Sequence, residues 1–189
     1  MIRPVLLLCL LNFALIGALP RVFFRPGTLN RSWWLTALPL FAMAIVLLVR
    51  LVMGAASGAV VMSWPAAVVL AAASIALIGV TIGVHRVPLA LWHQTDDRAH
   101  DLVTHGPYAR IRHPFYSAFL LALAAAVAAV PSPLTLIIAL PGAWQLQRTA
   151  VREEERLSAQ FGTAYVTYMQ RTGRFLPRLR KRELDYSTP

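Results

Sequence analysis

Residues 114–147 read PFYSAFLLALAAAVAAVPSPLTLIIALPGAWQLQ, a stretch without a charged side chain. One helical crossing of a bilayer takes roughly 17 to 25 such residues. The motif Pro131-Ser132-Pro133 divides the stretch, and prolines one residue apart favour a turn because each removes a helical donor and restrains its neighbour. We therefore predict a helical hairpin, with one arm before Val130 and the other after Leu134.

Three uncharged stretches precede this hairpin: Pro4–Pro20, Ser32–Val49, and the part of Leu51–Val84 that begins near Val60. Each approaches the length of a membrane span. The chain is 58% hydrophobic and only 14% charged, whereas an ordinary soluble domain is about 25% charged. The fold expected is an all-α integral membrane protein with about five transmembrane helices.

The basic residues indicate how these helices are oriented. With five spans, sixteen of the eighteen Lys and Arg residues fall on one side, and only Arg3 and Arg50 on the other. The positive-inside rule makes the basic side cytoplasmic. We expect an inner-membrane protein with its N-terminus outside and its C-terminus in the cytoplasm. Arg21 and Arg25 would resist export, so we expect the first stretch to be a retained helix and not a cleaved signal peptide.

Composition also limits the partners. The net charge of +10 comes from residues that flank apolar spans and form no separate domain, so membrane lipids with anionic headgroups are expected as partners and nucleic acid is not. The single cysteine, Cys9, excludes an intrachain disulfide and a zinc–cysteine cluster. We divide the chain into an N-terminal membrane region (1–84), a loop, hairpin and C-terminal helix (85–177), and a basic tail (178–189). The oligomeric state is not indicated.

A polar, aromatic loop precedes the hairpin, over residues 100–116. Gly106-Pro107 is a turn signal, and His113-Pro114 suits the start of a helix, where proline costs no hydrogen bond. The free amides of that first turn favour an anionic group. Tyr108 and Tyr116 offer aromatic faces to a planar base or a sulfonium. The alternative is a turn that anchors the chain at the headgroup level through its tyrosines.

Acidic residues follow the hairpin. Glu153, Glu154 and Glu155 are three of only eight acids in the chain. An acid near membrane depth is a candidate ligand-binding group, while a solvated, salt-bridged helix face is the alternative. All five histidines lie in residues 85–113. None has the spacing that places two metal ligands on one helix face, so no metal site is predicted.

Together, these motifs resemble the isoprenylcysteine carboxyl methyltransferase and phospholipid methyltransferase superfamily of integral membrane enzymes. The resemblance covers roughly His93 to Pro177. It rests on His-x-Leu-Val-Thr-x-Gly-x-Tyr (100–108), Arg-His-Pro-x-Tyr (112–116), the Glu-Glu-x-x-Leu-x-x-x-Phe-Gly-x-x-Tyr run (153–165), and the proline at 177.

The resemblance implies methyl transfer from S-adenosylmethionine at the cytoplasmic membrane face, to a lipid or another hydrophobic acceptor with a carboxylate, amine or thiol. The cofactor-binding residues that it implies are His93, His100, Asp101, Leu102, Val103, Tyr108, His113, Pro114, Phe115, Tyr116, Glu153 and Glu154. Relatives place a substrate-binding arginine where this chain has Thr149. Arg148 and Arg152 are the candidates to replace it in positioning the substrate.

Two other functions remain open at this point. Membrane reductases of the sterol type carry a similar Arg-His-Pro-x-Tyr element and use NADPH, although their chains are usually longer. A non-catalytic membrane scaffold would need none of the loop motifs, and no intramembrane charge marks a transport route.

Overall fold

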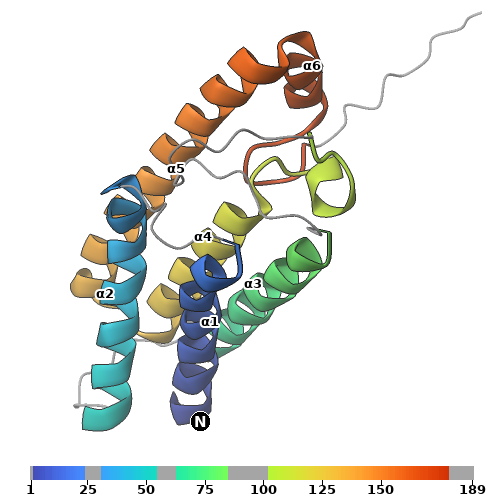
Figure 1. Ribbon diagram of the computed structural model, residues 1–189. Helices are drawn as coiled ribbons and strands as arrows, with labels where there is room; N and C mark the ends of the chain where they lie inside the picture. Colours follow the sequence, from blue (N-terminus) through green and yellow to red (C-terminus); the bar gives the residue numbers. More distant parts are fainter. Residues whose placement is uncertain (1, 24–30, 55–62, 85–101, 179–189) are drawn as a thin grey trace, which may run out of the picture.

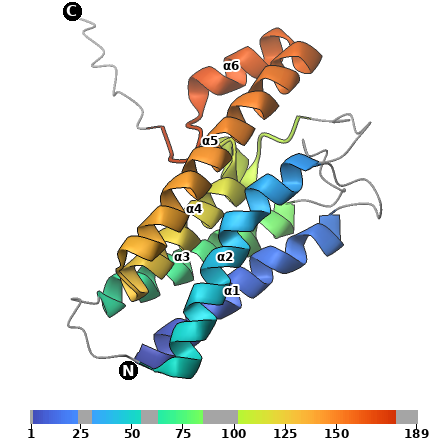
Figure 2. The same cartoon turned by 90° about the vertical axis from the view of Figure 1, so that its left-hand side faces the viewer.

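The computed structural model describes residues 2–23, 31–54, 63–84 and 102–178. The described chain is helical and contains no strand beyond one isolated bridge, which confirms the all-α prediction. Its elements are α1 (Ile2–Phe23), α2 (Arg31–Met53), α3 (Trp64–Val84), the 3-10 turn η1 (Gly106–Ala109), α4 (Pro114–Ala129), α5 (Pro133–Phe161) and α6 (Thr163–Arg171). The first four α-helices and the first half of α5 lie together, and the rest of α5 projects beyond them to α6 (Figures 1 and 2).

Three of the helices are long and apolar enough to cross a membrane. Their spans are Ile2–Leu19, Leu35–Met53 and Trp64–Val84, with mean hydropathies of 2.1, 2.4 and 2.5. These are α1, α2 and α3, at the three N-terminal stretches predicted. α4 is apolar too, over 16 residues. α2 continues beyond Val49, where the predicted stretch ended, through Arg50 to Met53, because arginine is a good helix former and its charge suits the C-terminal end of a helix.

The turn predicted at Pro131-Ser132-Pro133 is confirmed. α4 ends at Ala129, and Ser132 caps the start of α5 in a capping box with Thr135. Pro133 takes the first helical position, where its missing donor costs nothing. The structure differs in the length of the second arm, because α5 does not stop after the apolar residues. No glycine or proline interrupts residues 143–161, so one helix carries both the apolar arm and the glutamates.

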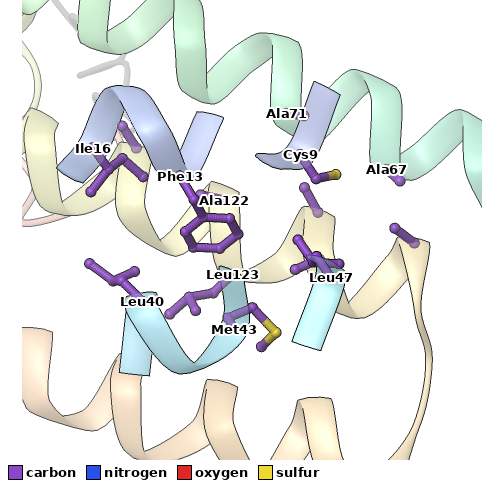
Figure 3. Close-up of a cluster of buried hydrophobic side chains, with 14 of the residues drawn as sticks. Cys9, Phe13, Ile16, Leu40, Met43, Leu47, Ala67, Ala71, Ala122 and Leu123 are labelled. Carbon is purple, nitrogen blue, oxygen red and sulfur yellow. The ribbon is translucent and has the colours of Figure 1, made fainter. Parts of the chain in front are cut away.

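Apolar side chains of α1, α2, α3 and α4 fill the core (Figure 3). α3 packs against α4, and many of the buried residues of these two helices are alanines, which allow helix backbones to approach closely. These alanines are Ala67, Ala71, Ala118, Ala122, Ala125, Ala126 and Ala129. The small residues of the hairpin therefore serve packing within the chain.

One buried polar contact joins three helices. The Ser74 hydroxyl of α3 lies 3.1 Å from Oδ1 of Asn12 in α1 and 2.7 Å from the Ala118 carbonyl oxygen in α4. All three residues are fully buried. A hydrogen bond in such an apolar setting fixes the relative positions of the helices. The result is a defined position for α4, whose N-terminus lies beside η1 at the end of the bundle from which α5 projects (Figure 1).

Candidate active site

The loop that precedes α4 is built around η1. Gly106 has a positive φ of 60°, and a Cβ there would collide with the Val84 side chain at the end of α3. Glycine is therefore required both for the backbone conformation and for the close approach. The amide of Tyr108 donates to the His105 carbonyl at 3.2 Å, and that of Arg110 to the Pro107 carbonyl at 3.1 Å. The predicted Gly106-Pro107 turn is confirmed, and it is packed against α3.

His113 is the residue immediately before α4, and Pro114 is the first residue of the helix. The His113 side chain is buried, with 7% of its residue surface exposed. Its ring stacks on that of Tyr116, with centroids 5.4 Å apart and planes inclined by 12°. The stacked pair is the aromatic face of the site.

Glu153 and Glu154 approach this pair from α5. Both are buried, with exposed fractions of 9% and 6%. Nδ1 of His113 lies 3.3 Å from Oε2 of Glu153, and the Tyr116 hydroxyl donates to Oε1 of Glu153 at 2.6 Å. Nε2 of His113 lies 3.3 Å from Oε1 of Glu154, at ion-pair distance but without the angle of a hydrogen bond. The imidazole is thus held between two carboxylates.

Two arginines donate hydrogen bonds to the Glu154 carboxylate. Nε of Arg112 donates to Oε1 of Glu154 at 2.8 Å. Arg174 donates through Nε to both oxygens, at 3.0 and 3.1 Å, and through Nη2 to Oε2 at 2.6 Å. Such charge-assisted, bidentate pairs are the strongest hydrogen bonds of proteins. Glu154 is therefore saturated by protein donors.

These contacts shift the protonation of the cluster. Burial tends to lower the pKa of His113, but the neighbouring carboxylates of Glu153 and Glu154 outweigh it and raise the pKa. Burial tends to raise the pKa of Glu154, but His113, Arg174 and Arg112 together hold it well below its usual range. The arrangement favours an imidazolium at His113 and a carboxylate at Glu154, with the adjoining arginines adding positive charge.

The predicted site residues fall into three groups. His113, Pro114, Phe115, Tyr116, Glu153 and Glu154 are all buried at the junction of α4 and α5. Leu102, Val103 and Tyr108 are half-buried in the loop, and burial raises the pKa of Tyr108 so that its phenol stays neutral. His93, His100 and Asp101 lie outside the described residues.

The predicted substrate-positioning arginines do not reach this cluster. Arg148 and Arg152 lie on the exposed face of α5, and the Arg148 guanidinium sits 4.6 Å from the centroid of the Trp144 ring. Thr149, which takes the place of the expected arginine, is buried and lies 3.4 Å from the Thr36 hydroxyl. The arginines at the site are instead Arg112 and Arg174. Arg112 belongs to the Arg-His-Pro motif, and Arg174 carries no comparable sequence signal.

Residues 92–160 match the model of the isoprenylcysteine carboxyl methyltransferase family. No curated protein matches the chain. The matched segment includes η1, α4 and nearly all of α5, and therefore His113, Tyr116 and both buried glutamates. The predicted resemblance to membrane methyltransferases is confirmed over these residues.

Proposed function

From the match of residues 92–160 to this methyltransferase family, we propose that the protein is a membrane enzyme that transfers a methyl group from S-adenosylmethionine to a lipid or another hydrophobic acceptor. The observation that supports this proposal best is that the matched segment folds around a single buried cluster. Residues 113–116 and 153–154 are separated by a complete helical hairpin, yet His113 lies 3.3 Å from each glutamate.

The chemistry of these side chains fits such a cofactor. The cofactor carries an amino acid end, a ribose, an adenine and a sulfonium, and it supplies an electrophilic methyl group. The Tyr116 ring, which stacks on His113, offers an aromatic face to a planar base. Glu153 can accept hydrogen bonds from ammonium or hydroxyl groups. The first amides of α4, where no side chain caps the helix, favour a carboxylate.

In the proposed reaction, the protein positions the reacting groups and excludes water from them. Methyl displacement at a sulfonium is a one-step reaction that is accelerated chiefly by alignment of the reacting groups. The burial of His113 and Glu153 keeps water away from them. We assign no general base. Arg148 and Arg152 remain proposed substrate-positioning residues, because a guanidinium can orient an acidic acceptor bidentately.

We also propose that α4 and α5 add two crossings to the three N-terminal spans, with the site at the cytoplasmic face of an inner membrane. The support is the distribution of charge. η1, the amino end of α4 and the carboxyl end of α5 lie at one end of the bundle (Figure 1), and the arginines at 110, 112, 148, 152 and 156 belong to these elements or adjoin them. An acceptor with an apolar tail could then reach the site from the lipid.

The test is a calorimetric titration of the detergent-purified protein with S-adenosylhomocysteine. We expect binding by the unaltered protein and loss of binding in His113→Ala and Glu153→Ala. His105→Ala and Glu155→Ala are matched controls, because both side chains are exposed, and they should bind as the unaltered protein does. A folded protein that binds NADPH and no S-adenosylhomocysteine would overturn the proposal in favour of a reductase.

A further inference from the structure

The C-terminal residues that follow α6 lie against the candidate site. Ile111 and Gly173 form a parallel bridge. The amide of Arg112 donates to the Gly173 carbonyl at 2.8 Å, that of His113 to the Arg174 carbonyl at 3.1 Å, and that of Gly173 to the Arg110 carbonyl at 3.0 Å. We call residues 172–175 the C-terminal strap. Its backbone is paired with the residues that lead into α4.

Side chains fasten the strap at both ends. The Ser117 hydroxyl of α4 donates to the Phe175 carbonyl at 2.7 Å, and the Phe175 ring lies 6.2 Å from the His113 ring. At the other end, Nη1 of Arg112 donates to the Thr172 carbonyl, and just before the strap the Tyr168 hydroxyl of α6 donates to the Tyr108 carbonyl at 2.7 Å. The strap is thus fixed to the loop on one side of His113 and to α4 on the other.

From these contacts we infer that the C-terminal strap is a wall of the cofactor site, and that Arg174 is a positioning residue which holds the His113 ring through Glu154. Both oxygens of Glu154 accept from Arg174, and the same carboxylate lies 3.3 Å from Nε2 of His113. Arg174 lies beyond the segment that matches the family model, which ends at residue 160. The role of the strap in binding rests on the proposed function.

The two buried glutamates make different contacts. Glu154 is fully occupied by Arg112, Arg174 and His113, so it serves the site from behind the imidazole. Glu153 accepts from the Tyr116 hydroxyl and faces the other ring nitrogen.

The coupling can be measured without any ligand, through the pH dependence of the melting temperature. Among the residues that the structure describes, the charged and titratable groups around His113 are Arg112, Tyr116, Glu153, Glu154 and Arg174. In Arg174→Gln, the Glu154 carboxylate loses its bidentate partner and holds the imidazolium more strongly. We expect the midpoint of the alkaline decline to move to higher pH, and we expect no movement in Arg171→Gln, whose side chain is exposed at the end of α6. An unmoved midpoint in folded Arg174→Gln would overturn the coupling.

Calorimetry with S-adenosylhomocysteine then tests the wall. We expect the affinity to fall on the order of tenfold in Arg174→Gln, and the losses in Arg174→Gln and Glu154→Gln not to add in the double variant. Arg171→Gln should bind normally. If Arg174→Gln does not fold, the affinity of Arg174→Lys tests the inference instead, since a lysine keeps the charge but loses the bidentate geometry. Normal affinity in the folded variant would overturn the inference. Failure of the unaltered protein to bind would overturn the proposed function and this wall, and the pH measurement would still decide the coupling.

Discussion

Among single residues, His113 has a closely constrained environment, because its two ring nitrogens face two different carboxylates. Replacing Glu154 would leave the buried Arg112 guanidinium without that carboxylate, and breaking a buried ion pair in this way typically costs about 3–5 kcal/mol. His113, Pro114 and Tyr116 belong to one sequence motif, Arg-His-Pro-x-Tyr, and the structure shows a separate role for each of them. Pro114 starts the helix, Tyr116 stacks on the imidazole, and the tyrosine hydroxyl reaches Glu153.

The shifted pKa values of the cluster predict how stability depends on pH. The pKa of His113 is raised, so its contribution is complete below the ordinary value of 6.5 and is lost as the pH rises through the raised pKa. The pKa of Glu154 is lowered, so its contribution is complete above the ordinary value of 4.5 and is lost as the pH falls. We expect the melting temperature in detergent to be highest between about pH 4.5 and 6.5.

The variant His113→Gln is the control for this profile. It should keep the decline on the acid side, which belongs to Glu154, and lose the decline on the alkaline side. Each unit of pKa shift corresponds to about 1.4 kcal/mol of stability, which is large enough to see in a melting curve. An alkaline decline that persists in His113→Gln would show that another group causes it.

Among the helices, α5 links the helical bundle to the site. Its first half carries exposed apolar side chains, including Trp144 with 58% of its surface exposed. Its second half carries the two buried glutamates. Because one uninterrupted helix joins the two halves, the packing of the first half fixes the direction from which Glu153 and Glu154 approach α4.

Gly142 of α5 lies close to both α2 and α4. A Cβ at this position would lie 2.9 Å from Cβ of Pro39 in α2 and 3.2 Å from Cδ1 of Leu123 in α4. We expect Gly142→Ala to lower the stability by about 1–3 kcal/mol, the usual cost of overpacking, as measured by the melting temperature in detergent. Gly79→Ala in α3 is the matched control, because nothing lies within 4 Å of its added Cβ. Equal shifts in the two variants would mean that the close approach of α5 has no energetic consequence.

For the whole molecule, the proposed orientation in the membrane can be tested by cysteine labelling. We expect Pro131→Cys, in the turn between α4 and α5, to react with a membrane-impermeant maleimide in intact cells. Gln170→Cys, exposed on α6, should react only after the inner membrane is permeabilised. The native Cys9 is buried in α1, so the unaltered protein supplies the background. The reverse labelling pattern would invert the topology and place the site outside.

The sequence by itself determined the all-helical fold and the turn that separates the two helices near residues 130–133. It also placed His113, Tyr116, Glu153 and Glu154 in one candidate site. The turn was predictable because a proline acts on its own backbone and on its neighbour. The long apolar stretches were predictable because span length depends only on local composition. The site was predictable only through the resemblance to a family, since physical reasoning on each motif left an anchoring turn and a salt-bridged helix open.

The tertiary structure alone decided how these residues are paired. Glu153 and Glu154 are adjacent and chemically identical, yet one faces Tyr116 and the other is saturated by Arg112 and Arg174. The bond from Arg112 to Glu154 spans 42 residues of sequence, and that from Arg174 spans 20. Spacing along the chain cannot specify such contacts, because they depend on the path of the hairpin and on the rotation of α5 about its axis. For the same reason, only the packing of α5 determines that Arg148 and Arg152 lie on its exposed face.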